Sequence, residues 1–342
     1  MKAAIYNPYL DTLGGGERYT LSFAKILAEK EYRVDVQWSK RDILNKLEKR
    51  FGMDLKDIGI VSDIKRGDGY DICFWVSDGS IPLLRARQNF LHFQVPFRNV
   101  NGRSLINKMK LFRINKVIVN SNFTKKYIDK EYGVDSLVIY PPVDTERFKS
   151  GKKENVILNV GRFSHLLQSK NQHILVNTFI KFYNSGYNNW RFILAGGIEV
   201  GTGDYINKLR KIAKDYPVEI ILSPDFNQLN KLYNKAKIFW SAVGYGFDEY
   251  KNPTKVEHFG ISVVEAMASG AVPFAFKAGG YKEIIKEGFS GFLWRKQSEL
   301  LKKTRGLIED KGLYNTLSRN VQEESKKFNL DTFRKNVLTT LK

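Results

Sequence analysis

Cysteine and histidine are scarce in this chain of 342 residues. It contains one cysteine, Cys73, and four histidines, so an internal disulfide is impossible and no Cys/His cluster has zinc-binding spacing. No apolar run approaches the roughly 18 residues of a membrane span. Residues 1–8 read as a strand and turn, too short for the apolar core of a signal peptide. We therefore expect a reduced, cytoplasmic protein, with the inner face of the cell membrane as an alternative location.

Several sequence motifs are also missing. There is no Asp-x-Asp, the usual cue for a metal-bridged diphosphate, so we predict metal-independent chemistry and no metal site. There is no Gly-x-Gly-x-x-Gly after the first expected strand, which argues against a nicotinamide-dependent oxidoreductase, and no Gly-Lys-Ser/Thr of a P-loop. A recognition motif or aromatic strand for nucleic acid is absent too.

Acidic residues are outnumbered by basic ones. The chain has 56 Lys+Arg and 36 Asp+Glu, a net charge of +20, and the excess is spread over both halves of the sequence. A solvated surface, an anionic membrane, a polyanion and a phosphate-bearing small molecule are all compatible with this charge. The 42% of apolar residues is enough for packed cores, which excludes wholesale disorder.

Strand-like and helix-like segments alternate along nearly the whole chain. Such alternation predicts parallel sheets built from right-handed crossovers, an α/β fold with two Rossmann-like, doubly wound domains. Pro141-Pro142 and the polar residues 148–154 interrupt the pattern, because proline ends regular structure. We place an N-terminal domain at 1–147 and a C-terminal domain at 148–330. Ligands of doubly wound sheets bind at the carboxyl ends of the strands.

A glycine-rich turn follows the first expected strand. Gly14, Gly15 and Gly16 precede Glu17 and a helical pattern. Glycines allow close backbone approach, and the free N–H groups of a helix N-terminus suit a phosphate or a sugar oxygen. A tight strand-to-helix turn without a ligand is the alternative.

Two cations follow the first strand of the second domain. Gly161-Arg162 comes directly after it, and Lys170 lies eight residues on. An arginine at a strand end and a nearby lysine can clamp a diphosphate. Ordinary surface cations are the alternative interpretation.

The most specific pattern is a pair of carboxylates. Glu257 and Glu265 lie eight residues apart around a turn that contains Gly260. One carboxylate can reach a sugar ring while the other holds a ribose, and the N–H groups of Phe259 to Ile261 can face the diphosphate. An amphipathic helix with a solvated glutamate is the alternative.

The string EHFGISVVEAMASG at 257–270 resembles the E-x7-E element of the retaining family 4 glycosyltransferases, which have the GT-B fold. Further segments match in the same order: GGGERYTLSFAKIL, VNSNFTKKYI with VIYPPVD, NVGRFS with KNQ, FILAGG, and VPFAFKAGGYKEII with GFSGFLW. The resemblance covers about residues 1–340. Glu257-His258-Phe259-Gly260 is also similar to the lipid-linked-oligosaccharide mannosyltransferases of that family, a likeness too short to fix the sugar.

The resemblance implies roles for the matching residues. A diphosphate would be neutralised by Arg162 and Lys170, a sugar would be bound by Glu257, and a ribose by Glu265. His92 would contact the sugar or position the acceptor, with a core histidine as the alternative. The implied catalytic residues are Arg162, Lys170, Glu257 and His92. The implied donor-binding residues are Gly15, Gly16, Gly161, Ser223, His258, Phe259, Gly260, Ile261 and Glu265.

The implied protein is a GT-B enzyme whose two domains face a central cleft, with a C-terminal helix at about 331–342 packed on the first domain. It would transfer a hexosyl group, with retention, from a UDP- or GDP-sugar to a glycan, a polyprenyl-phosphate-linked acceptor or a glycolipid. No cofactor, metal or nucleic acid is implied. A non-catalytic GT-B subunit and a polyanion-binding protein are the alternatives.

One segment bears on partners. Residues 104–116 place Leu105, Met109 and Phe112 on one helical face, with Lys108 and Lys110 among the cations elsewhere on the helix. A basic amphipathic helix of this kind can lie on an anionic membrane leaflet. A helix packed in the core with a solvated basic face is the alternative.

Overall fold

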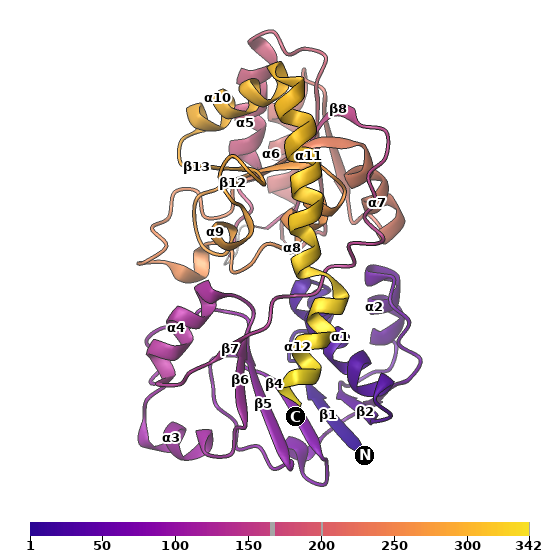
Figure 1. Ribbon diagram of the computed structural model, residues 1–342, viewed down its shortest axis with the longest axis vertical. Coiled ribbons are helices and arrows are strands. Elements are labelled where there is room, and N and C mark those ends of the chain that lie inside the picture. Colours follow the sequence, from indigo (N-terminus) through magenta and orange to yellow (C-terminus); the bar gives the residue numbers. More distant parts are fainter. Residues whose placement is uncertain (165–167, 200, 342) are drawn as a thin grey trace. The chain divides into compact units, whose positions relative to one another are not determined.

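The computed structural model describes residues 1–164, 168–199 and 201–341, and the chain folds into two α/β units (Figure 1). Unit 1 consists of Met1–Pro142 and Leu330–Lys342, and unit 2 consists of Val143–Asn329. The first boundary therefore lies directly after Pro142, five residues before the expected one. Val143 belongs to unit 2 because it forms an isolated parallel bridge with Asn329.

Unit 1 is built on a seven-stranded parallel sheet of order β3-β2-β1-β4-β5-β6-β7. Its strands are β1 (Lys2–Tyr6), β2 (Arg33–Gln37), β3 (Ile58–Val61), β4 (Ile72–Val76), β5 (Gln88–Phe93), β6 (Lys116–Val119) and β7 (Leu137–Val138). Its helices are α1 (Gly15–Glu29), α2 (Ile43–Phe51), α3 (Leu105–Leu111), α4 (Asn122–Tyr132) and α12 (Leu330–Thr340), with short 3-10 turns at Leu10–Thr12 and Lys65–Gly67. The chain order of the strands reverses at β1, which lies between β2 and β4.

The C-terminal helix α12 packs in unit 1 against α1 (Figure 1). Phe333 and Val337 are buried in the same core cluster as Phe23 and Phe74. The ring of Phe333 meets that of Tyr19 edge-on, with centroids 5.0 Å apart. The burial of these aromatic rings stabilises the packing of α12 on this unit.

Unit 2 is built on a six-stranded parallel sheet of order β10-β9-β8-β11-β12-β13. Its strands are β8 (Glu154–Val160), β9 (Arg191–Gly196), β10 (Val218–Leu222), β11 (Ala236–Ser241), β12 (Val272–Phe276) and β13 (Phe292–Trp294). Its helices are α5 (Gln172–Asn184), α6 (Gly203–Ala213), α7 (Phe226–Lys235), α8 (Ile261–Ala268), α9 (Tyr281–Ile284), α10 (Gln297–Glu309) and α11 (Lys311–Ser325), with 3-10 turns at Pro253–Lys255 and Lys326–Phe328.

The strand order of unit 2 reverses at β8, which lies between β9 and β11. At such a switch point the loops leaving the two central strands diverge and leave a crevice at the carboxyl edge of the sheet. The loop after β8 carries Arg162 and Lys170, and the loop after β11 carries Glu257. The topology therefore brings the predicted clamp and the first predicted carboxylate to the same edge.

Side-chain caps explain several of the helix starts. Ser121 caps α4, because its Oγ accepts a hydrogen bond from the N–H of Thr124 at 3.0 Å. Asp225 and Gln228 form a capping box at α7. These side chains satisfy N–H groups that have no partner in the first helical turn. Among the described residues, no helix is long and apolar enough to cross a membrane.

Candidate active site

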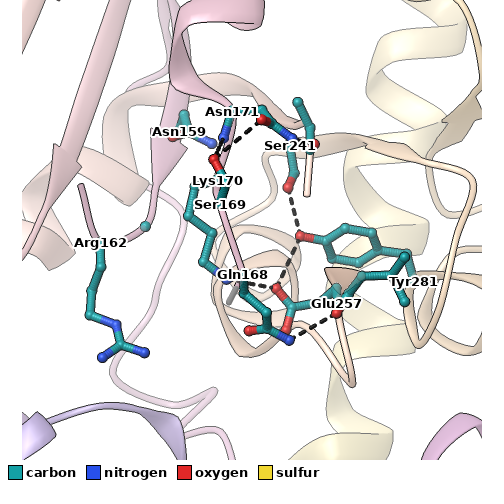
Figure 2. Close-up of polar contacts among 12 residues, drawn as sticks. Asn159, Arg162, Gln168, Ser169, Lys170, Asn171, Ser241, Glu257 and Tyr281 are labelled. Carbon is teal, nitrogen blue, oxygen red and sulfur yellow. Dashed lines mark hydrogen bonds and ion pairs between the residues drawn. The ribbon is translucent and has the colours of Figure 1, made fainter. Parts of the chain in front are cut away.

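The best-defined polar cluster of unit 2 is centred on Glu257. Its Oε2 lies 3.0 Å from Nζ of Lys170 in an ion pair that is mostly shielded from solvent. The hydroxyl of Tyr281 lies 3.5 Å from the same oxygen and 2.6 Å from the hydroxyl of Ser241. Figure 2 shows Lys170 and Tyr281 reaching the Glu257 carboxylate from different sides. The Glu257 carboxylate is therefore held by two partners from different segments of the chain, one of which, Tyr281, is itself fixed by Ser241.

The surroundings decide the charge state of this cluster. Burial alone would raise the pKa of Glu257. The positive charge of Lys170, together with an electrostatic interaction and a backbone hydrogen bond from His258, lowers this pKa below its ordinary value. Burial, reinforced by the charge of Glu257, raises the pKa of Tyr281 well above its ordinary value. At neutral pH the cluster therefore contains a carboxylate and a neutral phenol. This arrangement can accept hydrogen bonds from sugar hydroxyls without itself exchanging a proton.

Backbone contacts fix the segment that carries Glu257. Its carbonyl accepts a hydrogen bond from the N–H of Gly280 at 2.8 Å. Gln168 donates from Nε2 to the carbonyl of Val256 at 2.8 Å, and Glu249 accepts from the N–H of Gly279 at 2.7 Å. These supporting residues were not foreseen from the sequence. Only their close placement in the folded chain reveals them, because none belongs to a motif with its own chemistry.

Arg162 lies at the start of the loop after β8 and points away from the Glu257 cluster (Figure 2). Its Nη1 is 3.3 Å from Oε1 of Glu199, and its side chain is 44% exposed. Its carbonyl accepts a hydrogen bond from Nε2 of Gln172 at 3.0 Å, which ties the loop to the first turn of α5. The two predicted diphosphate ligands are therefore on one loop but separately paired, Arg162 with Glu199 and Lys170 with Glu257.

Gly161 sits at a close contact between neighbouring strand ends. A Cβ atom on Gly196, at the end of β9, would overlap the carbonyl oxygen of Gly161. Ser223, which follows β10, has a left-handed backbone with φ of 49° and donates its N–H to the carbonyl of Gly196 at 2.7 Å. The ends of β8, β9 and β10 thus form one linked edge, with the side chain of Ser223 exposed.

The N-terminus of α8 lies directly after Glu257. Gly260 is its N-cap and has φ of 119°, and a Cβ atom there would come within 2.6 Å of Cε1 of Tyr281. Ile261 begins the helix, so its N–H belongs to the first turn, which has no acceptor within the helix. Phe259 is buried with its ring 5.3 Å from that of Phe328, and His258 is buried too. Glycine is therefore required for the tyrosine to reach Glu257.

The second carboxylate, Glu265, lies one turn inside α8 and is buried. Its Oε2 accepts a hydrogen bond from the hydroxyl of Tyr233 on α7 at 2.8 Å. The interpretation of Glu265 as a solvated surface residue is therefore wrong. Its contact with a ribose stays a prediction.

In unit 1, Gly15 and Gly16 form the first residues of α1. The N-terminus of this helix already has an internal anion, because Oε2 of Glu17 accepts hydrogen bonds from the N–H of Gly14 at 2.6 Å and from Oγ1 of Thr12 at 2.8 Å. A Cβ atom on Gly16 would overlap the side-chain oxygen of Gln94, whose Nε2 donates to the carbonyl of Gly16 at 3.1 Å. The close approach allowed by Gly16 is therefore used by Gln94.

His92, the remaining predicted catalytic residue, is completely buried near the end of β5. Its ring stacks on Tyr19 with centroids 4.1 Å apart, and Nδ1 lies 3.2 Å from the carbonyl oxygen of Ile118. Burial lowers the pKa of His92 to about 3. The structure gives His92 the surroundings of a neutral core histidine, and its contact with a sugar or acceptor stays a prediction.

No cluster of three or more His, Cys, Asp or Glu side chains suited to a metal ion occurs among the described residues. The cations, carboxylates and helix N-terminus gathered at one edge of unit 2 are suited instead to a ligand that carries both phosphate and hydroxyl groups. Two parallel α/β units with such a site are the arrangement expected of a nucleotide-sugar enzyme of the GT-B class.

Comparison with known proteins agrees with this class. Residues 142–324 match the model of the family "Glycosyl transferases group 1", which is more than half of the chain. The chain therefore belongs to this family of glycosyltransferases. Similar solved structures include Anabaena Alr3699/HepE in complex with UDP, with a TM-score of 0.80 at 19% identity over 100% of this chain and 99% of that one. A glycosyltransferase from Rickettsia africae has a TM-score of 0.78 at 17% identity, over 100% and 98%. These likenesses show the GT-B fold.

The curated relatives that this chain matches are much longer than the chain. The GDP-Man:Man(3)GlcNAc(2)-PP-Dol alpha-1,2-mannosyltransferase of Dictyostelium discoideum is 27% identical over 249 residues, which cover 66% of this chain and 46% of the relative. The alpha-1,3/1,6-mannosyltransferase ALG2 of Candida glabrata is 24% identical over 241 residues, 59% of this chain and 50% of the relative. The chain spans about half the length of the curated relatives it matches.

Proposed function

We propose that this protein is a retaining, metal-independent hexosyltransferase that takes a sugar from a nucleoside diphosphate and transfers it to a lipid-linked glycan. The observation that carries the proposal is the Lys170–Glu257 pair at the switch point of unit 2, with Arg162 on the same loop and Glu265 in the following helix. A carboxylate for the sugar hydroxyls, two cations for the diphosphate and a second carboxylate for the ribose match the three parts of a nucleotide sugar.

Each group has a role in the proposed transfer. The bond between the anomeric carbon and the diphosphate oxygen breaks, and its electron pair stays on the diphosphate. Arg162, Lys170 and the first N–H groups of α8 stabilise the negative charge that develops there. The acceptor oxygen bonds to the anomeric carbon on the face that the diphosphate leaves, and its proton passes to a phosphate oxygen. Glu257 holds the sugar hydroxyls, and Glu265 holds the ribose.

The donor and acceptor classes are proposed from the relatives. The Dictyostelium discoideum and Homo sapiens relatives are named as mannosyltransferases that use GDP-mannose and a dolichyl-diphosphate-linked oligosaccharide. The solved structures of similar fold contain UDP or UDP-glucose. We therefore propose a mannosyl or glucosyl donor, and an acceptor glycan anchored in a membrane by a polyprenyl diphosphate or a glycolipid.

The first experiment is a thermal-shift panel of GDP-mannose, UDP-glucose, UDP-N-acetylglucosamine and ADP-glucose, each with EDTA. A ligand that binds only the folded state raises the melting temperature, so we expect one donor to do so in wild type and to lose the effect in Glu265→Ala. The matched control is Ser262→Ala, which lies in the same helix as Glu265 and whose side chain has no assigned role. A shift that requires Mg²⁺ would overturn metal independence, and no shift with any donor would overturn donor binding.

A further inference from the structure

The helix α3 of unit 1 presents large apolar side chains to solvent. None of its residues is buried, and Leu105, Ile106, Met109 and Phe112 are between 63% and 90% exposed. The interpretation of this segment as a helix packed in the core by these side chains is therefore wrong. A contiguous group of exposed apolar residues marks an interaction surface far more often than it marks ordinary protein surface.

The four side chains lie on one face. At about 100° per residue, positions 105, 106, 109 and 112 fall within an arc of roughly 120°. Leu111 and Ile114 fall on the opposite side, and both pack against the hydrophobic cluster around Phe93 and Tyr132. The helix is thus attached to unit 1 by one side and displays its other side. We call the displayed set, Leu105, Ile106, Met109 and Phe112, the α3 face.

The loop that leads into α3 is attached to α4 by hydrogen bonds and close packing. The carboxylate of Glu131 on α4 accepts hydrogen bonds from the N–H groups of Asn99, Val100 and Gly102 at 3.0, 2.9 and 3.3 Å. Gly102 packs so closely on α4 that a Cβ atom would lie 2.7 Å from the carbonyl oxygen of Glu131. Ser104 then caps α3 through the N–H of Asn107 at 3.3 Å. The exposed apolar residues therefore belong to an anchored element.

The sequence around this face is strongly basic, although Glu131 binds the loop before α3 and some of the cations, such as Lys125, are paired with aspartates. Residues 79–128 contain no Asp or Glu and ten Lys or Arg: Arg85, Arg87, Arg98, Arg103, Lys108, Lys110, Arg113, Lys116, Lys125 and Lys126. This segment alone contributes +10 of the net charge of +20. Lys108 and Lys110 flank the α3 face on its two sides, and Arg113 follows within the same arc just after the helix. Apolar side chains surrounded by cations match the interface of a bilayer that contains anionic lipids.

We propose that the α3 face docks unit 1 onto an anionic membrane surface, with its apolar side chains inserted at the headgroup level and its cations on lipid phosphates. A single short helix offers much less than the roughly 800 Å² per partner of a standard protein–protein interface. It is sufficient for a peripheral membrane contact, which adds apolar insertion to electrostatic attraction. The inference deepens the proposed use of a lipid-linked acceptor, but vesicle binding tests it without any transfer reaction.

The test is co-sedimentation of the full chain with vesicles of phosphatidylcholine alone or with 30% phosphatidylglycerol, at about 150 mM salt. We expect wild type to bind the anionic vesicles at least tenfold more strongly than the neutral ones. The variant Ile106→Ser/Met109→Ser/Phe112→Ser should lose at least tenfold in affinity for the anionic vesicles, and Lys108→Gln/Lys110→Gln/Arg113→Gln should lose a similar amount. Phe289→Ser/Leu137→Ser, which removes exposed apolar side chains elsewhere, should bind like wild type.

Two further readouts keep the outcomes distinct. Melting temperatures should agree among all variants, because the altered side chains make few contacts, and the donor-induced thermal shift should persist in the serine variant. If no donor raises the melting temperature of wild type, that result counts against the proposed function and leaves the membrane-docking proposal intact. Equal vesicle binding by wild type and the serine variant overturns the docking proposal. So does a wild-type dimer that the serine variant converts to a monomer, since the α3 face would then join two copies of the chain.

Discussion

Nζ of Lys170 lies 3.0 Å from Oε2 of Glu257, although 87 positions separate the two residues in the sequence. The lysine comes from the loop after β8 and the glutamate from the loop after β11, the two strands at which the sheet order of unit 2 reverses. Both side chains are mostly buried. A pair of this kind affects stability and function together, because removing either partner leaves an uncompensated charge in a poorly solvated place.

Lys170→Met should therefore destabilise the protein by about 3 kcal/mol, since the Glu257 carboxylate loses its cation. The variant should also lose at least about a hundredfold in transfer, if a charge on the leaving diphosphate is no longer neutralised. Urea unfolding measures the first effect, and initial rates with saturating donor measure the second.

The double variant Lys170→Met/Glu257→Gln separates these two effects. With neither charge present, stability should return to within about 1–2 kcal/mol of wild type, whereas transfer should stay as low as in the single variant. Recovery of transfer in the double variant would mean that the pair only supports the fold.

Arg162 is expected to exchange Glu199 for a diphosphate. Arg162→Met should weaken binding of the nucleoside diphosphate by at least about tenfold, because a charge-assisted hydrogen bond is lost. Glu199→Gln should strengthen it by up to about fivefold, since a half-exposed ion pair holds its arginine by about 1 kcal/mol at most. Isothermal titration with the nucleotide measures both. Weaker binding by Glu199→Gln would contradict the competition and assign Glu199 a direct role in the ligand site.

Glu265 is expected to recognise ribose. For wild type, a 2′,3′-dideoxy nucleotide should bind about 10–100-fold more weakly than the ribonucleotide, the loss expected for hydrogen bonds to a charged group. Glu265→Ala should bind both nucleotides with the same low affinity. Tyr233→Phe should retain part of the discrimination, because it removes only a hydrogen bond that orients the carboxylate. A Glu265→Ala protein that still prefers the ribonucleotide would exclude this role.

His92 should make stability depend on pH in acid. Because burial lowers its pKa to about 3, the folded state keeps a neutral imidazole, while the unfolded chain takes up a proton below about pH 6.5. The unfolded state therefore binds more protons between pH 6.5 and 3. This stabilisation is complete above pH 6.5 and falls by about 1.4 kcal/mol per unit as the pH drops.

His92→Phe should remove that slope, because phenylalanine can keep the stack on Tyr19 and does not titrate. Urea midpoints from pH 4 to 8 for both proteins give the comparison. Identical slopes would show that His92 is accessible to protons in the folded state, which would favour its predicted role near a sugar or acceptor.

Much of the fold could be predicted from local pattern. Alternating strands and helices predicted the two parallel α/β units, and the structure confirms them. Short or irregular elements were less accessible. The strand β3 (Ile58–Val61) is only four residues long and contains Gly59, and glycine is unfavourable in strands, so the local pattern for a strand is weak there.

The sequence by itself determined which chemical groups this protein has to work with: Arg162 and Lys170 after one strand, Glu257 and Glu265 around one glycine turn, and an apolar and basic segment at 104–116. Their resemblance to the motifs of a known glycosyltransferase family, and not their spacing alone, pointed to a nucleotide-sugar class. Only the tertiary structure decided which of them meet. It joined Lys170 to Glu257, buried His92 against Tyr19, filled the space at Gly16 with Gln94, and left the α3 face exposed. Such outcomes depend on which distant segments pack together, and that is set by the burial of the whole core rather than by the residues of any one motif.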